Sequence, residues 1–346
     1  MRGYLNTSRI GTVAACCAVV ACGLFFLTFP HGRATNATPF PELLSALPAG
    51  APTLVYVDLA GLRASSFYQH RPDKGPITVP NQDYAAFVRS TGFDFEKDLD
   101  RVVVASWPPT PGTTQRKNVV IAEGRFDQAK IRDYAAKKGK LDHQQGHDVY
   151  VFSAGDQTGP ESLTFLDDRR IALVAGSTIA PLFAANSNAS SPDPVRERAA
   201  RLDGATAFMI TMVPPTPDPP VAGGDQGVPA QQFLALARSL RWITLAARAE
   251  GDNLRISLEG ECDSSTDAQQ LKSALELLRM FANAGLQDPK NTQATPPAAL
   301  AFMKTLLTSA ELSQSEQNVR IRMELTPDVF KLSEPATGNS PASPKS

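Results

Sequence analysis

The chain has 346 residues, a length that suits two domains of ordinary size better than one. Its 34 basic and 35 acidic side chains leave a formal net charge of −1. This balance provides no excess of positive charge to hold a phosphate backbone, so it argues against a nucleic-acid partner. The hydrophobic share of 42% is typical of a globular protein and excludes a largely disordered chain.

Residues 10–29 form an apolar segment without a charged side chain or a proline. A helix of this length, at about 1.5 Å rise per residue, spans roughly 30 Å, which is the thickness of a bilayer core. Residues 1–9 carry Arg2 and Arg9 and no acid, so we expect them to remain in the cytoplasm. The segment therefore predicts a single-pass signal anchor in the inner membrane of a bacterial-type cell envelope. Residues 30–346 would then be extracytoplasmic, in the periplasm.

Two other fates of this segment stay open. The small residues Thr35-Asn36-Ala37 offer a site at which a signal peptidase would release the chain. Val19-Val20-Ala21-Cys22 resembles a bacterial lipobox, in which Cys22 would carry the lipid. The anchor is preferred because the apolar run is long for a signal peptide and continues past Cys22 without a polar tether.

A first α+β unit is predicted over residues 51–195, joined to the membrane segment by a tether at 30–50 with a short helical turn at 41–47. Apolar and β-branched runs predict the strands, while capping residues mark the helix ends. Asp58 and Asp127 each precede a predicted helix, and Gly92 and Gly139 each follow one. Strands are expected at 53–59, 101–107, 118–123, 148–152, 163–166 and 171–175, and helices at 62–68, 84–90, 128–138 and from Ser177.

A second α+β unit is predicted over residues 196–333, and residues 334–346 are predicted to be a disordered tail because they are rich in Pro, Ser, Gly and Lys. The long helix at 267–286 has apolar residues at helical spacing, which predicts one buried stripe. That stripe consists of Leu271, Ala274, Leu275, Leu278, Phe281 and Ala282. Strands are expected at 205–213, 242–249, 254–262, 311–315 and 319–325, and further helices at 231–240 and 298–307.

Both units have the element order strand, helix, hairpin, helix, hairpin, short helix. This order predicts an α+β fold made of two similar antiparallel-sheet units with packed helices, which is an internal duplication. The sequences of the two units are not alike, so the prediction depends on the order of elements alone. One continuous sheet shared by the two halves would also fit.

Three segments of the first unit read LPAGAPTLVYVDL (residues 47–59), GFDFEKDLDR (92–101) and AEGRFD (122–127). Together with the preceding export segment, they resemble a family of uncharacterised bacterial envelope proteins. The resemblance covers roughly residues 45–180. It implies an envelope location and an α+β fold, and it supplies no activity.

His143 and His147 are the closest pair among the four histidines and the candidate metal ligands. Gly146 lies between them and a predicted strand follows, which indicates a turn rather than one face of a helix. The pair also lacks the glutamate of the zinc-protease helix motif. We therefore expect solvated turn residues, with no metal and no cofactor.

Motifs for nucleophilic catalysis and phosphate binding are absent from the sequence, since it contains no G-x-S-x-G elbow, P-loop or G-x-G-x-x-G. Ser177 is expected to cap a helix. The carboxylate pairs at 94/96, 98/100 and 167/168 are expected to be solvated turn residues. No catalytic residue is assigned on these grounds.

Cys262 is the only cysteine outside the apolar segment, which holds Cys16, Cys17 and Cys22. One thiol cannot form an intramolecular disulfide, so the extracytoplasmic body is expected to fold on its core alone. Alternation along residues 255–262 places Cys262 on an apolar strand face, which predicts a small buried side chain.

These observations favour a non-catalytic, membrane-anchored extracytoplasmic protein that binds another envelope component. The alternative is an extracytoplasmic hydrolase that uses carboxylates or a metal. An exposed apolar patch would favour the binding protein. A deep pocket that gathers His143, His147 and acidic residues would favour the hydrolase.

Overall fold

The computed structural model describes residues 40–70, 82–109, 116–152, 161–184, 193–214, 238–288 and 297–333. The predicted membrane segment, the alternative cleavage site, Cys22 and the C-terminal tail lie outside the described residues, as does most of the predicted helix at 231–240. Within the described ranges, no helix combines the length and apolar character needed to cross a bilayer.

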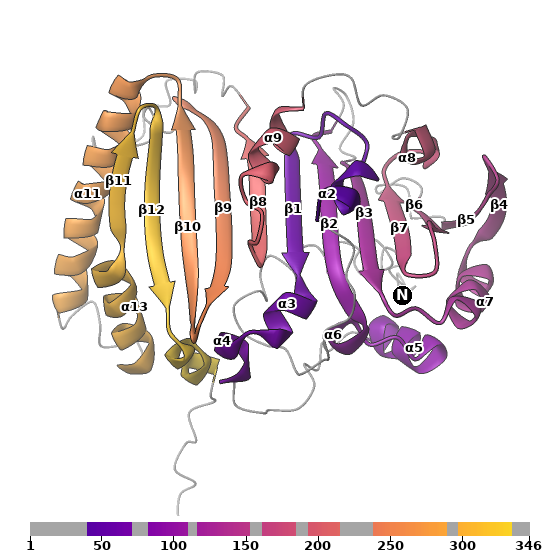
Figure 1. The fold of residues 1–346 in the computed structure, drawn as a ribbon. Helices are drawn as coiled ribbons and strands as arrows, with labels where there is room; N and C mark the ends of the chain where they lie inside the picture. Colours follow the sequence, from indigo (N-terminus) through magenta and orange to yellow (C-terminus); the bar gives the residue numbers. More distant parts are fainter. Residues whose placement is uncertain are drawn as a thin grey trace, which may run out of the picture.

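The strands of the described chain form one antiparallel sheet of twelve (Figure 1). They are β1 (Thr53–Asp58), β2 (Leu99–Trp107), β3 (Lys117–Gly124), β4 (Lys140–Gln144), β5 (His147–Phe152), β6 (Glu161–Phe165), β7 (Arg170–Ala175), β8 (Ala207–Met212), β9 (Leu240–Glu250), β10 (Asn253–Cys262), β11 (Glu311–Ser315) and β12 (Asn318–Leu325). Across the sheet their order is β11-β12-β10-β9-β8-β1-β2-β3-β7-β6-β5-β4. The α+β class is confirmed, and so is the alternative of one shared sheet.

The two halves of this sheet meet at β1 and β8, which pair antiparallel in its middle. The first half comprises β1 to β7, and the second comprises β8 to β12. Moving outward from the centre, the first half runs β1, β2, β3, β7, β6, and the second runs β8, β9, β10, β12, β11. The strand order is therefore equivalent in the two halves, except that β5 and β4 extend the first.

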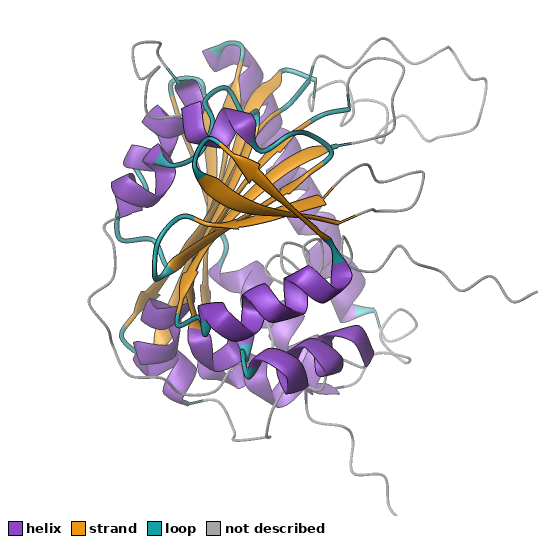
Figure 2. Cartoon of the chain, turned by 90° about the vertical axis from the view of Figure 1, so that its right-hand side faces the viewer, coloured by secondary structure: helices purple, strands orange, loops and turns teal. Residues whose placement is uncertain are grey.

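Side chains alternate between the two faces of a strand, so the pairing register assigns each residue to a face. We call the side of Tyr56 and Phe208 face A and the opposite side, which holds Val57 and Ala207, face B. Figure 2 shows helices on both sides of the sheet. The helices of face A are α2 (Phe40–Ser45), α8 (Ala180–Ala184) and α9 (Pro194–Ala200). Those of face B are α3 (Leu59–Ala64), α4 (Ser66–Gln69), α5 (Gln82–Thr91), α6 (Phe95–Asp98), α7 (Gln128–Lys138), α11 (Ser265–Gln287), α13 (Pro297–Ser309) and the 3-10 helix η2 (Pro327–Ser333).

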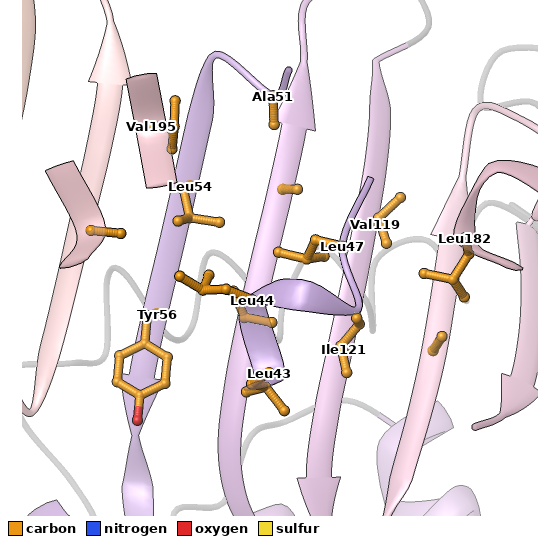
Figure 3. Packing of buried hydrophobic residues seen from close by; sticks show 14 of the residues in the cluster. Leu43, Leu44, Leu47, Ala51, Leu54, Tyr56, Val119, Ile121, Leu182 and Val195 are labelled. Carbon is orange, nitrogen blue, oxygen red and sulfur yellow. The ribbon is translucent and has the colours of Figure 1, made fainter. Parts of the chain in front are cut away.

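Face A of the first half is covered by an apolar core (Figure 3). The α2 side chains Leu43, Leu44 and Leu47 point onto the strands beside Tyr56 and Ile121. Leu43 is completely buried. α2 lies within the predicted tether, so these leucines of the tether are core residues.

Face A of the second half is polar, and no described helix covers it beyond the region of α9. The pairing of β9, β10 and β12 brings charged side chains together on this side, and none of them is buried. They are Arg248, Arg255, Glu259, Arg320, Arg322 and Glu324. The described helices thus sandwich the sheet in its first half and cover face B alone over most of its second.

Several helix ends follow the predicted capping. The Asp58 carboxylate accepts a hydrogen bond from the Gly61 N–H at 2.8 Å, and that of Asp127 accepts one from Lys130 N–H at 3.2 Å. Gly92 ends α5 with a φ of +73°, a conformation that favours glycine. The helix expected at 62–68 is divided into α3 and α4, because Ser65 ends the first and caps the second.

Candidate functional site

The candidate site is the outer side of α11, the long helix beside β11 at the edge of the second half (Figure 1). The helix begins after Ser264, whose hydroxyl accepts a hydrogen bond from the Asp267 N–H at 3.1 Å. The same hydroxyl donates to the Asp267 carboxylate at 2.5 Å. These reciprocal contacts satisfy a backbone donor of the first turn and place an acid where the helix dipole favours it.

The N-terminal half of α11 packs on the sheet as its apolar spacing predicts. Ala268 and Leu271 are buried, and they form a cluster with Cys262 of β10 and Val319 of β12. Leu275 packs against the same cluster and is partly buried. This half of the helix is therefore fixed by the core of the second half.

The C-terminal half of α11 is apolar and exposed. Leu277, Leu278, Met280 and Phe281 are 49%, 53%, 65% and 62% exposed, and we call these four residues the α11 patch. The prediction that Leu278 and Phe281 belong to the buried stripe is wrong, while Ala274 and Ala282 are partly buried. β11 is a short edge strand with no further described strand beyond it, so the sheet offers these side chains no surface to pack on.

The patch has the spacing of a helix-packing surface. Leu277, Met280, Phe281 and the exposed Ala284 stand at i, i+3, i+4 and i+7, so they share one side of the helix. At 100° per residue, Met280 points away from the buried Leu271. The C-terminal half of α11 is therefore apolar on two sides, while the chain's own core occupies only one.

Polar groups border the patch and hold the helix in place. The Arg279 guanidinium donates to the Ala310 carbonyl at 2.8 Å, which ties the helix to the residue before β11. Lys272 and Glu276 form an ion pair of 3.2 Å one turn before the patch. An apolar centre with a polar border is the usual composition of a protein interface.

The predicted metal candidates, His143 and His147, lie on opposite faces of the β4–β5 hairpin. Cross-strand partners share a face, and His143 is opposite Asp148 whereas His147 is opposite Gln144. His143 Nδ1 lies 2.9 Å from an Asp148 oxygen, while the His147 ring stacks on Phe183 at a centroid distance of 4.4 Å. The described residues contain no group of three His, Cys, Asp or Glu that could hold a metal ion.

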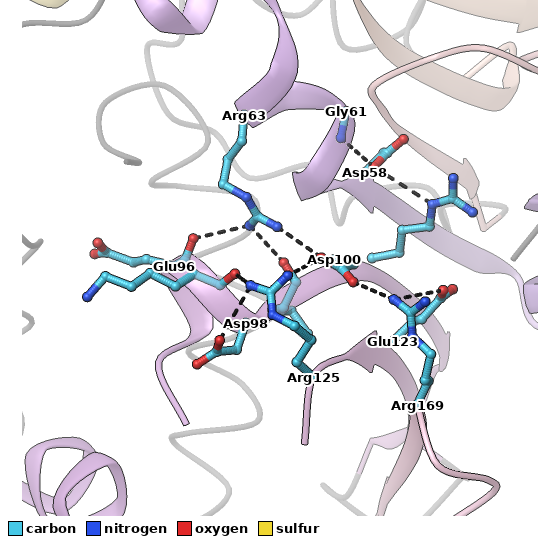
Figure 4. A network of polar contacts seen from close by, with 12 residues as sticks. Asp58, Gly61, Arg63, Glu96, Asp98, Asp100, Glu123, Arg125 and Arg169 are labelled. Carbon is cyan, nitrogen blue, oxygen red and sulfur yellow. Dashed lines mark hydrogen bonds and ion pairs between the residues drawn. The ribbon is translucent and has the colours of Figure 1, made fainter. Parts of the chain in front are cut away.

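The prediction that the acidic residues at 94–100 are solvated is wrong for two of them. Glu96 and Asp100 are 2% and 0% exposed. Asp100 lies in a network of charges at one end of β1, β2 and β3, and the Glu96 backbone carbonyl accepts a hydrogen bond from Arg63 of that network (Figure 4). In contrast, Asp168 is exposed, and Asp167 accepts from the backbone N–H groups that follow it in the β6–β7 turn. The pair at 167/168 thus behaves as expected.

Asp100 is the centre of the charge network. The register of β2 shifts between Leu99 and Arg101, so Asp100 lies in a β-bulge. Its two oxygens lie 3.2 Å from Arg63 Nη2 and 2.7 Å from Arg169 Nη2. Arg125 Nη1 lies 3.8 Å away. Three guanidinium groups thus surround one buried carboxylate.

The charge network joins elements that are distant in sequence. Arg63 of α3 also donates to the carbonyls of Glu96 and Leu99, at 3.1 and 2.8 Å. Arg169, from the β6–β7 turn, lies 3.9 Å from the buried Glu123 of β3. Burial lowers the pKa of Arg63, and the neighbouring Asp100 opposes that shift. The contacts are those of a structural junction, since arginines lie beside the Asp100 and Glu123 carboxylates.

Ser177 and Cys262 complete the predicted candidates. The helix expected from Ser177 begins at Ala180, and the Ser177 hydroxyl donates to the Thr178 carbonyl at 3.1 Å. Cys262 is a buried free thiol, 2% exposed, as the strand alternation predicts. Burial raises the pKa of the Cys262 thiol, which keeps it protonated and unreactive.

No family model matches the chain, and no curated protein matches it. Three crystal forms of a protein named TP0453 are similar in structure, at 10–11% sequence identity over 85–86% of this chain and 96–98% of theirs. Their TM-scores are 0.42, 0.46 and 0.42. The family resemblance given by residues 47–59, 92–101 and 122–127 stays a prediction.

Proposed function

We propose that the protein is a non-catalytic component of a cell envelope whose α11 patch binds a helix of another envelope protein. The observation that carries this proposal is the exposure of four large apolar side chains on one turn-and-a-half of helix, each between 49% and 65% exposed. Contiguous apolar surface of this kind usually marks an interaction site, whereas single exposed apolar residues are common.

The spacing of the patch supports a helical partner. Residues at i, i+3, i+4 and i+7 form a ridge that packs into the groove of a second helix. Such packing would cover Leu277, Met280 and Phe281 together. A helix that is apolar on two sides is normally buried on both, and the described residues cover only one side of α11.

The ionisable groups support binding over hydrolysis. A hydrolase would need carboxylates or a metal facing a substrate. Here Asp100 is enclosed by arginines, and His143 and His147 lie on opposite faces of a hairpin. The hydrolase remains the second candidate function, and it would be tested by assaying the purified full chain against ester and glycoside substrates.

The membrane attachment is part of the same proposal. Retention of residues 10–29 as an anchor would place the α11 patch outside the cytoplasm, where envelope partners are found. Intact-mass measurement of the membrane-extracted protein tests this attachment. A mass that lacks residues 1–37 would replace the anchor by a cleaved signal peptide, and a lipid adduct on Cys22 would identify a lipoprotein.

Photo-crosslinking in native membranes tests the binding surface. A photoreactive amino acid at Met280 of the full chain is expected to give a reproducible adduct with one protein. The same group at Gln270, on the same helix before the patch, is the matched control. Phe281→Glu should remove the Met280 adduct while leaving the melting temperature unchanged, since Phe281 is 62% exposed. Equal adducts at Met280 and Gln270 would overturn the proposal.

We further propose that the units predicted at 51–195 and 196–333 descend from a duplication. The equivalent strand orders on the two sides of the β1–β8 pair support this origin. A stability test follows from it. If the units are also separate domains, the unit containing residues 51–195 should unfold cooperatively when it is expressed alone.

A further inference from the structure

Among the described residues, the outer edge of β4 is a second surface without a partner. β4 is the last strand of the sheet, and β5 is its only described neighbour. Residues 140–143 are all exposed, and Leu141 is 43% exposed. An edge strand carries backbone N–H and C=O groups that can pair with another strand. We propose that two copies of this protein associate through β4 and join their sheets in antiparallel fashion.

The hairpin turn identifies the backbone groups that point outward. Gln145 and Gly146 have φ values of 50° and 83°, so both turn residues are left-handed, as in a type I′ turn. The residues flanking a two-residue turn form a hydrogen-bonded pair, which here is Gln144 with His147. Alternation then directs the backbone groups of Leu141 and His143 away from β5.

Of these outward groups, those of Leu141 are the ones open to a second strand. The His143 N–H already donates to the Asp142 carboxylate at 2.9 Å. Within the described residues, the Leu141 N–H and carbonyl make no backbone hydrogen bond outside the β4–β5 pairing. Two copies that pair at Leu141 would exchange both of these hydrogen bonds across a two-fold axis.

The side chains of β4 select this register. When two strands pair antiparallel around Leu141, Leu141 faces Leu141 of the second copy. Lys140 then faces Asp142 of the second copy, and this charge pair occurs twice. Centring the pair on Lys140 or Asp142 would instead place like charges opposite each other, which is unfavourable. The Leu141-centred register therefore combines an apolar contact with two charge pairs.

The positions of the β4 side chains on the two faces of the sheet are consistent with this register. Leu141 is opposite Tyr150 of β5, so it lies on face B at the margin of the core. Lys140 and Asp142 point to face A. At the opposite edge of the sheet, α11 packs against β11. If two β11 strands paired in the same way, Glu311 would have no basic residue opposite it, because β11 contains none. Pairing through β4 alone gives a closed dimer rather than a fibre.

Disulfide trapping in native membranes tests the dimer. Cα atoms of a hydrogen-bonded antiparallel pair are about 5.5 Å apart, which is within reach of a disulfide. Leu141→Cys in a chain that also carries Cys16→Ala, Cys17→Ala and Cys22→Ala should give a dimer under mild oxidation. Asp168→Cys in the same background is the control, because Asp168 is also exposed and lies outside β4. We expect several-fold more dimer from Leu141→Cys.

Charge-reversal variants distinguish a disulfide formed in this register from one formed by random collision. Lys140→Glu would oppose two acids and should lower the yield of the Leu141→Cys dimer several-fold. Adding Asp142→Lys to that variant restores opposite charges and should restore the dimer. Equal trapping at Leu141 and Asp168, or a yield that ignores both charge changes, would overturn the proposal. Neither result depends on the α11 patch, so the two surfaces are tested independently.

Discussion

The two halves of the sheet share a strand order and differ in the number of faces that the described helices cover. In the first half, α2 and α8 cover face A, with α9 beside β8 at the junction of the two halves, while α3, α6 and α7 cover face B. In the second half, α11, α13 and η2 cover face B, and face A carries charged side chains. One pattern of strand pairing therefore supports either a sandwiched or a one-sided sheet, depending on whether helices supply an apolar cover.

The same difference sets the environment of the charges. Asp100 in the first half is completely buried among arginines. Glu259 and Arg320, paired on face A of the second half, have side chains that are 27% and 40% exposed. Burial makes the first group costly to disrupt, while water can replace much of the second contact. Substitutions in matched pairs can test this contrast.

The largest effect is expected from Asp100→Ala. This change leaves Arg63 buried without its carboxylate partner, so it should lower the free energy of unfolding by about 3–5 kcal/mol. Glu259→Ala in the second half should cost no more than about 1 kcal/mol, because the pair is partly exposed. Urea unfolding of the full chain, followed by circular dichroism, measures both. Equal losses of unfolding free energy in the two variants would show that burial does not make the Asp100 contacts more stabilising than the Glu259 pair.

A smaller effect is expected when the cover of face A is thinned. Leu43→Ala removes a completely buried α2 side chain and should cost about 2–5 kcal/mol. Ser257 lies on face A of the second half and is partly exposed, so Ser257→Ala should stay within about 0.5 kcal/mol. Both variants are measured by thermal unfolding. A loss at Ser257 similar to that at Leu43 would indicate that face A of the second half is also packed.

The smallest effect concerns Glu161, at the start of β6 in the first half. Burial raises the pKa of this carboxyl group, so its ionisation opposes folding once the pH rises through the raised pKa. Glu161→Gln should therefore stabilise the protein at pH 7 and make no difference below the ordinary glutamate pKa of about 4.3. Melting temperatures across this pH range measure the change. Glu311→Gln, at an exposed position of β11, is the control, and an equal gain there would contradict the prediction.

The sequence by itself determined the local elements. Asp58 and Asp127 cap helices, Gly92 ends α5, and alternation predicted most strands and the buried Cys262. These features depend on neighbours within a few residues, so a single chain is sufficient to recognise them. Alternation did not predict the hairpin strand β4, because four of its five residues are polar and four of the five are exposed.

The tertiary structure decided which apolar and charged groups the chain itself covers. A helical period shows that α11 has apolar sides. Only the position of α11 at the edge of the sheet shows that the described residues leave the α11 patch about half exposed or more. From the sequence, Asp100 is expected to be a solvated turn residue. In the structure it lies in a β-bulge and is buried at the centre of the charge network. Periodicity reports the direction of a side chain relative to its own element. What lies in that direction depends on strands and helices that are distant in sequence.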